Sequence, residues 1–264
     1  MMQIKFTRKN LSIPYFIFLL LFVVAPLIVL FYYAFTNGSG KFTISNFTGF
    51  FTNSNTVGTL FYSFAIAFVT TIICLMLAYP TAYFLATSKL KTKSVIIMLF
   101  VLPMWINFSL RITALKEILT LIEGNLAFYP FLNTIIGMTY DFLPFMILPI
   151  YTAIEKLDPA LLEAAKDLGA NDREAFLRIT LPLSMPGIAS GISMVFLPAM
   201  TNYVVLDMLY NSTYIMGSLI GSYFTTDNWN FGSMIALILL LIICVFALLT
   251  NTKEEVNETG GELL

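Results

Sequence analysis

Few residues in this sequence have types and surroundings that suggest chemistry, and the clearest is a carboxylate inside an apolar window. Asp141 falls near the middle of residues 131–154, where a charge costs about 2.5–3.5 kcal/mol on membrane-insertion scales. A charged residue type at that cost is a candidate for a transport pathway, or for a structural role inside a helical bundle, either as an ion pair with Arg111 or as a neutral hydrogen-bonding group. Both interpretations are open at the level of sequence.

Catalytic and metal chemistry find little support. The sequence has no histidine, which removes the commonest metal ligand and general base, and with it the metalloprotease motif HExxH. Cys74 and Cys244 lie in apolar segments without CxxC spacing, a pattern typical of small core residues. Residues 38–41 read GSGK, but Phe35 and Phe42 stand where a phosphate-binding loop needs Gly and Ser or Thr. We expect no catalytic residue, no metal site and no ATP site in this chain.

The composition is that of a membrane protein. Hydrophobic residues make up 58% of the chain and charged residues 11%, against about a quarter charged in a soluble domain. Crossing a bilayer core of about 30 Å takes about 20 apolar residues in a helix. We therefore expect an all-α, polytopic protein in a lipid bilayer, with six transmembrane helices and with prolines that mark kinks and not breaks. The six apolar windows are residues 13–35, 58–87, 94–112, 131–154, 187–206 and 232–250.

The distribution of Lys and Arg predicts the orientation, because loops on the cytoplasmic side carry an excess of both. With the N-terminus inside, the external set has three members: Lys41, Arg111 and Lys116. The cytoplasmic set has eleven: Lys5, Arg8, Lys9, Lys89, Lys91, Lys93, Lys156, Lys166, Arg173, Arg178 and Lys253. We expect both termini to face the cytoplasm. The net charge of −1 and the lack of a basic tract predict no nucleic-acid partner.

Residues 155–187 form a polar stretch between two apolar windows, and they predict a short cytoplasmic helix. Asp158 can cap the helix, Pro159 suits its first turn, and Gly169 supplies the left-handed stop. We expect an apolar face opposite Glu163, Lys166 and Asp167. That face comprises Leu161, Leu162, Ala165 and Leu168.

A second short helix is predicted after it, capped by Asn171 or Asp172 and ended by Leu181 and Pro182. Two interpretations of the apolar face remain. The first helix either packs on its own transmembrane bundle or docks into an apolar groove of a soluble partner, where each buried leucine would contribute about 1.5–3 kcal/mol.

The stretch EAAKDLGANDREAFLRITLP, residues 163–182, resembles the EAA loop of ABC importer permeases. That loop has the pattern Glu-Ala-Ala, three residues, Gly, nine residues and Ile-x-Leu-Pro. It is matched by Glu163, Ala164, Ala165, Gly169, Ile179, Leu181 and Pro182. The resemblance covers residues 58–250 and implies the type-1, MetI-like permease fold. Residues 1–57 would add a cytoplasmic tail, a first transmembrane helix and an external loop, and residues 251–264 a cytoplasmic tail.

The resemblance also implies the partners. In this family the loop forms a coupling helix that sits in a cleft of a cytoplasmic ATPase subunit. It implies an ATPase dimer that uses ATP and Mg, a second homologous permease, a polyamine-binding protein outside the cell and no cofactor on this chain. It places the chain in a bacterial plasma membrane. The residues implied in ATPase coupling are Leu161, Leu162, Glu163, Ala164, Ala165 and Gly169.

Three further stretches are similar to the polyamine branch, the first permease subunits of spermidine/putrescine importers. They are LPMWINFSLRITALKEIL (102–119), FLPFMILPIYTAIEKLDPALLEAAKDLGA (142–170) and WNFGSMIALIL (229–239). A polycation crossing a region of low dielectric needs carboxylates or aromatic faces. The candidate pathway residues are Trp105, Asp141, Tyr203 and Asp207, each with structural packing as the alternative. Import of another small solute, such as an anion, an oxyanion or an amino acid, is the alternative function, with Arg111 as a binding residue.

Overall fold

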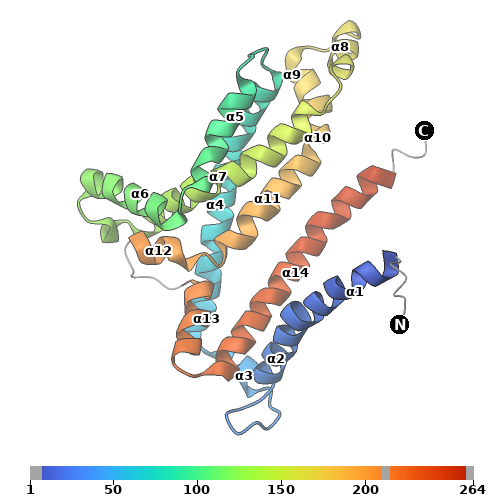
Figure 1. The fold of residues 1–264 in the computed structure, drawn as a ribbon. Coiled ribbons are helices and arrows are strands. Elements are labelled where there is room, and N and C mark those ends of the chain that lie inside the picture. Colours follow the sequence, from blue (N-terminus) through green and yellow to red (C-terminus); the bar gives the residue numbers. More distant parts are fainter. Residues whose placement is uncertain (1–7, 210–214, 260–264) are drawn as a thin grey trace, which may run out of the picture. The chain divides into compact units, whose positions relative to one another are not determined.

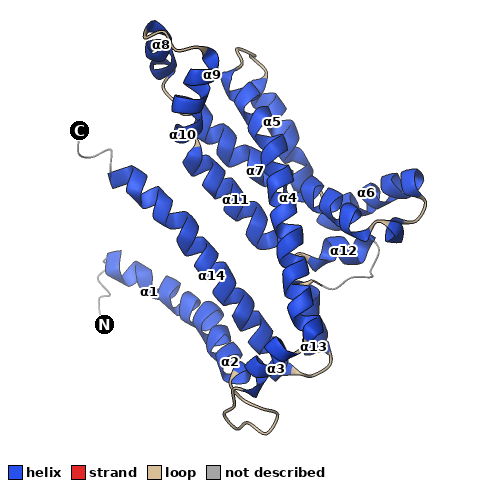
Figure 2. Cartoon of the chain, turned by 180° about the vertical axis from the view of Figure 1, so that it is seen from behind, coloured by secondary structure: helices blue, strands red, loops and turns tan. Residues whose placement is uncertain are grey.

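The structure is a computed structural model that describes the backbone of residues 8–209 and 215–259, and the side chains of residues 13–209 and 215–248. Within these ranges the protein is helical, and its only extended pairing is an isolated bridge between Thr36 and Phe42 (Figure 2). The predicted all-α class is confirmed. Lys5, assigned above to the cytoplasmic side, lies outside the described residues.

The elements follow one another as short and long helices without strands between them (Figure 1). In chain order they are α1 (Arg8–Leu19), the π-helical turn η1 (Leu20–Val24), α2 (Ala25–Ala34), α3 (Ser45–Thr52), α4 (Ser54–Thr87), α5 (Lys93–Val101), the 3-10 turn η2 (Leu102–Trp105), α6 (Phe108–Glu123), the 3-10 turn η3 (Leu126–Phe128), α7 (Pro130–Glu155), α8 (Pro159–Asp167), α9 (Asp172–Ala175), the π-helical turn η4 (Phe176–Thr180), α10 (Leu181–Leu183), α11 (Met185–Ala199), α12 (Tyr203–Leu209), α13 (Met216–Thr225) and α14 (Trp229–Thr259).

Four helical stretches in the described part of the chain are long and apolar enough to cross a membrane. Two bent helix pairs also qualify, which makes six spans if each pair counts as one. The straight stretches are Ile13–Ala34, Ser54–Thr87, Pro130–Glu155 and Trp229–Leu248. The last of these helices, α14, continues to Thr259, past residue 250 where the cytoplasmic tail was expected to begin.

The third window, 94–112, was predicted as one membrane span in which proline marks a kink and not a break, but the structure breaks the helix after Trp105. Lys93–Trp105 and Phe108–Glu123 meet at an angle of 99°. Ile106 and Asn107 have extended backbones, with ψ of 143° and 128°. The Asn107 side chain accepts hydrogen bonds from two N–H groups in the first turn of α6. Because an asparagine cap satisfies the free N–H groups of a new helix, the chain can turn here instead of continuing straight.

The fifth window, 187–206, was also predicted as one helix, and its bounds are wrong. α11 ends at Ala199 and α12 starts at Tyr203. The helical path extends instead toward the N-terminus, where Asp172–Leu183 joins Met185–Ala199 at a bend of 58°. The predicted stop at Leu181 and Pro182 does not occur, because proline is tolerated in the first turn of α10, where its missing N–H leaves no intrahelical bond unmade.

The chain divides into two compact units, Met1–Gly58 with Ser218–Ile242, and Thr59–Gly217 with Ile243–Leu264. In the first unit, two asparagines satisfy carbonyl groups at the end of α2, which have no partner within the helix. Asn230 donates to the carbonyls of Thr36 (2.7 Å) and Tyr33 (3.1 Å). Asn46 donates to the carbonyls of Ala34 and Thr36, both at 2.9 Å. These bonds join the end of α2 to α3 and to the start of α14.

In the second unit, α7 and α11 run side by side (Figures 1 and 2). Gly187 and Gly191 lie on one face of α11, four residues apart, and leave no room for a larger side chain. A Cβ at residue 187 would lie 2.6 Å from the carbonyl oxygen of Pro149, and one at residue 191 would lie 2.7 Å from the sulfur of Met146. Small residues at this spacing allow two membrane helices to approach closely.

Candidate functional site

Helix α8, predicted to lie on the cytoplasmic side, begins and ends with the residues that the sequence indicated. Asp158 Oδ1 accepts a hydrogen bond from the N–H of Ala160 at 2.9 Å. At the other end, Gly169 has φ of 88°, a left-handed conformation that glycine adopts without a Cβ penalty. The N–H groups of Gly169 and Ala170 donate to the carbonyls of Lys166 (2.9 Å) and Ala165 (3.0 Å). These two hydrogen bonds end the helix and fix the direction of the chain beyond it.

The predicted apolar face of α8 is only partly covered by the rest of the chain. Ala165 is buried and Leu162 is half-buried, whereas Leu161 is 46% and Leu168 90% exposed. Glu163 and Ala164 are exposed beside these leucines. Part of α8 thus packs on its own chain, and part presents an apolar surface.

The turn after α8 is held by polar contacts. Asn171 and Glu174 form a capping box at the start of α9, in which each side chain accepts from the other residue's N–H at 2.9 and 3.1 Å. Lys166 lies 2.9 Å from a carboxylate oxygen of Asp172, and this hydrogen bond raises the pKa of Lys166 above its ordinary value. Both pairs are exposed at the surface, so they orient α8 and α9 more than they stabilise the fold.

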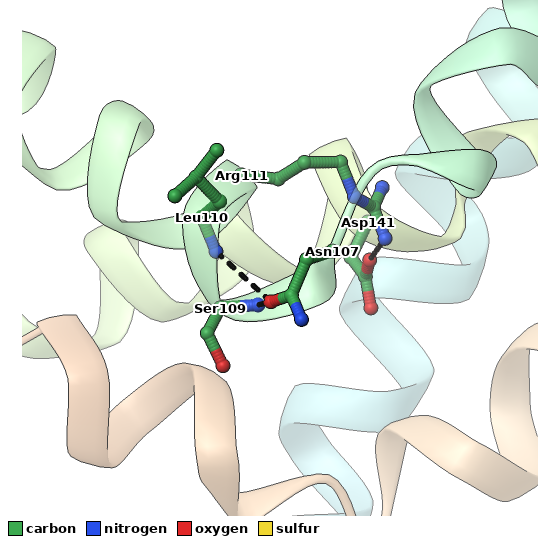
Figure 3. A network of polar contacts seen from close by, with 5 residues as sticks. All are labelled: Asn107, Ser109, Leu110, Arg111 and Asp141. Atoms are coloured by element: carbon green, nitrogen blue, oxygen red, sulfur yellow. Dashed lines mark hydrogen bonds and ion pairs between the residues drawn. The ribbon is translucent and has the colours of Figure 1, made fainter.

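Inside the membrane segment, Asp141 on α7 forms an ion pair with Arg111 on α6 (Figure 3). The Arg111 Nη2 lies 2.7 Å from Asp141 Oδ1, and both side chains are buried. Of the roles that the sequence left open for Asp141, the structure shows the ion pair with Arg111. Arg111, which the sequence analysis counted with the external residues, is buried in α6. In this structure the carboxylate of Asp141 is paired with the guanidinium of Arg111.

The other three pathway candidates lie at exposed positions near the two helix breaks. Trp105 ends η2 with 80% of its surface exposed, directly before the bend at Asn107. Tyr203, 40% exposed, and Asp207, also exposed, lie one turn apart on α12. No hydrogen bond, ion pair or ring contact joins any two of the four candidates in the part of the chain that the structure describes. Tyr203 and Asp207 share a helical face through their spacing of four residues.

The structure also shows contacts that the sequence interpretation missed. Tyr79 and Tyr83 on α4 contact the ring of Phe176 in η4. Lys93 at the start of α5 lies 3.0 Å from Glu155 at the end of α7, and Tyr151 donates to the same carboxylate at 2.7 Å. The spacing of four residues between Tyr79 and Tyr83 indicates that both rings lie on one face of the helix. It does not indicate their partner, because Phe176 lies about a hundred residues further along the chain.

The membrane helices and the capped segment between α7 and α11 are those of a class of protein, the permease subunits of ABC importers. The chain belongs to the family described as binding-protein-dependent transport system inner membrane component, which matches residues 78–252. The predicted family and fold are thereby confirmed. The family consists of permease subunits, which are not themselves enzymes, and it indicates a multi-pass protein of a bacterial membrane.

Three relatives show similarity over most of the chain. The spermidine/putrescine transport system permease protein PotB of Haemophilus influenzae is 37% identical, and the alignment covers 96% of this chain and 98% of that protein. PotB of Escherichia coli K12 is 35% identical over 75% of this chain and 80% of that protein. The PotB homolog of Mycoplasma genitalium is 35% identical over 63% of this chain and 61% of that protein.

Solved structures share the fold at low identity. A bacterial ABC transporter involved in the import of the acidic polysaccharide alginate has a chain that matches with a TM-score of 0.74 and 17% identity, over 94% of both chains. The MetNI methionine ABC transporter in an inward-facing conformation matches with a TM-score of 0.59 and 15% identity, over 74% of this chain and 93% of that chain. At these identities the likeness concerns the fold alone.

Proposed function

We propose that this chain is the first permease subunit of an ATP-driven importer of spermidine or putrescine. The observation that carries the proposal is the 37% identity to a spermidine/putrescine permease along almost the full length of both chains. The proposed mechanism is alternating access, in which the permease opens a central path first to one side of the membrane and then to the other. A binding protein outside the cell would deliver the cargo.

The partner that supplies the energy would be a cytoplasmic ABC ATPase dimer that binds ATP and Mg. The exposed side chains of Leu161, Ala164 and Leu168 form an apolar surface on α8. Glu163 adds a charge at its rim. Such a surface suits an apolar groove, because burial of each leucine would contribute about 1.5–3 kcal/mol. Leu162 and Ala165 would instead hold α8 on the permease, and Gly169 would end it at the correct place.

The cargo path would be completed by a second, homologous permease. The cation would meet a carboxylate and an aromatic ring on the same face of α12, from Asp207 and Tyr203, with Trp105 at the break between α5 and α6 as a further ring. Cation–π contacts contribute roughly 0.5–2 kcal/mol depending on how dry the site is. Asp141 would join the path only if the cargo or a conformational change released it from Arg111.

The test is uptake of radiolabelled spermidine and putrescine by cells that lack polyamine importers and express this permease with its partner permease, ATPase and binding protein. We expect saturable uptake that stops when the ATPase carries an inactivated ATP site. Competition with unlabelled amino acids and sulfate measures the alternative cargoes. Uptake of neither polyamine, together with uptake of one of these solutes, would contradict the proposed cargo.

A further inference from the structure

The cytoplasmic segment is joined to α4 by an aromatic contact. Phe176 is the first residue of η4. Its ring meets the ring of Tyr83 edge-on, with centroids 5.2 Å apart and an interplanar angle of 83°, and that of Tyr79 at 5.9 Å and 82°. Tyr79 and Tyr83 lie four residues apart in α4 and so face the same way. Edge-to-face aromatic packing of this kind has a preferred geometry and resists sliding.

A hydrogen bond ties the same tyrosine to the bend between the cytoplasmic segment and α11. The Tyr79 hydroxyl lies 3.0 Å from the hydroxyl of Ser184. Ser184 in turn donates to the carbonyl of Leu181 at 3.0 Å. Because a serine hydroxyl has one hydrogen, Tyr79 must be the donor to Ser184. Ser184 is fully buried and sits at the bend of 58° between Asp172–Leu183 and Met185–Ala199.

The local helix geometry makes this segment a rigid but distorted connection. The five residues from Phe176 to Thr180 form a π-helical turn, which is wider than an α-helical turn and is often found at functional sites. Helical structure continues through α10 to Ser184. A displacement of α8 and α9 would therefore pass along helical backbone to two points, the ring of Phe176 and the hydroxyl of Ser184.

We propose that Tyr79, Tyr83, Phe176 and Ser184 form a coupling junction, which carries movement of α8 into α4 and sets the bend before α11. They would act as positioning residues, through their contacts with one another. Close-packed contacts transmit displacement when their partners have little freedom to yield. The inference rests on the proposed function, since it assumes that an ATPase moves α8.

The junction is tested in the complete importer, reconstituted in proteoliposomes with its partner permease, ATPase and binding protein. We measure spermidine uptake and ATP hydrolysis together for Tyr79→Phe and Phe176→Leu. Tyr79→Phe removes only the hydroxyl that bonds Ser184, and Phe176→Leu removes the ring but keeps an apolar side chain. Tyr140→Phe is the matched control, because the Tyr140 hydroxyl makes no hydrogen bond with the residues that the structure describes. Phe176→Tyr keeps the ring and tests for rescue.

We expect both junction variants to assemble with the ATPase. The amount of cargo moved per ATP hydrolysed should fall about fivefold, which is the lower end of typical coupling between sites. Tyr140→Phe and Phe176→Tyr should keep the unaltered ratio. A ratio of uptake to hydrolysis that stays unchanged in both junction variants would overturn the proposal. A parallel fall of abundance, hydrolysis and uptake at constant ratio would do the same, since it indicates a structural role alone.

A second readout does not depend on which cargo the importer carries. Thr87→Cys, at the exposed cytoplasmic end of α4, is labelled with a thiol reagent with and without ATP, in a background of Cys74→Ala and Cys244→Ala. We expect ATP to change the labelling rate, and Tyr79→Phe and Phe176→Leu to remove most of that change. Persistence of the full change in both variants would refute the junction. If the unaltered importer takes up no polyamine, the proposed function fails, and this labelling still decides the junction.

Discussion

Arg111 and Asp141 form a buried ion pair across α6 and α7, with 2.7 Å between Nη2 and Oδ1 and side chains that are 8% and 6% exposed. The Nε and Nη1 of Arg111 have no hydrogen-bond partner among the described residues. The ring of Phe108 lies 5.9 Å from the guanidinium carbon and offers its face. Asp141 is thus the main compensation for this charge, and its removal would leave a buried cation without a counter-ion.

Asp141→Asn should therefore destabilise the protein by about 3–5 kcal/mol, the cost of breaking a buried pair. Arg111→Gln in the same chain should restore part of this loss, because no charge is then buried alone. The thermal midpoint of the purified protein in detergent measures both effects. Asp207→Asn is the matched control, since that carboxylate is exposed and has no ion pair in the described part of the chain; its midpoint should not move. An unchanged midpoint in Asp141→Asn would show that the pair contributes little.

The covered and uncovered parts of α8 predict different consequences for neighbouring leucines. Leu161→Glu and Leu168→Glu place a charge on the exposed face, so the permease should accumulate normally and lose co-purification of the ATPase. Leu162→Glu places a charge at a half-buried position, so abundance in the membrane should fall, because burial of a charge without a partner is costly. Quantitative blotting of membranes and of affinity-purified complexes measures both. Retention of the ATPase by both exposed-face variants would rule out this face as the docking surface.

Gly169 has φ of 88°, and nothing lies within 4 Å of a Cβ built on it. A side chain there would therefore meet no clash, and its cost would come from the left-handed backbone conformation alone. Gly169→Ala should cost about 1–2 kcal/mol of stability in the turn. Gly169→Pro should prevent the turn, because proline holds φ near −65°. Cargo uptake normalised to abundance should fall slightly in the first variant and be lost in the second. Equal uptake by both variants would show that the end of α8 does not depend on this conformation.

A substitution at Gly187 is expected to act through helix packing and not through backbone conformation. A Cβ there would lie 2.6 Å from both the Pro149 carbonyl oxygen and the Ala153 Cβ, so α7 and α11 must separate to admit it. Gly187→Ala should destabilise the protein by about 1–3 kcal/mol, measured as the thermal midpoint in detergent. Gly221→Ala is the control, because its Cβ meets nothing within 4 Å, and it should be neutral or stabilising. Equal midpoints for the two variants would argue against close packing at Gly187.

The orientation in the membrane is tested by labelling from outside. Asn53→Cys should react with a membrane-impermeant thiol reagent in intact cells, and Asp172→Cys only after the cells are permeabilised. Both positions are exposed in the structure, so access is decided by the side of the membrane and not by burial. Reaction of Asp172→Cys in sealed cells would reverse the assignment from the Lys and Arg distribution, and the ATPase could not then reach α8.

Much of the segment from Asp158 to Glu174 was predictable because its determinants are local. Asp158 caps the helix two residues on, Gly169 closes it through bonds to the preceding turn, and Asn171 pairs with Glu174. Each interaction spans a few residues, and residue type and spacing are then sufficient to indicate it. Apolar windows of about 20 residues likewise indicate membrane helices, since the bilayer imposes their length on any sequence.

The sequence by itself determined the class of the protein, its membrane helices and the two ends of α8. Only the tertiary structure decided that Asp141 is held by Arg111, that Leu162 is partly covered whereas Leu161 is exposed, and that Phe176 contacts α4. It also decided that the third window turns by 99° at Asn107. The physical reason is that these features depend on groups that lie far apart along the chain. Burial and pairing at one residue are set by which distant helix packs against it, and a local pattern of residue types carries no record of that neighbour.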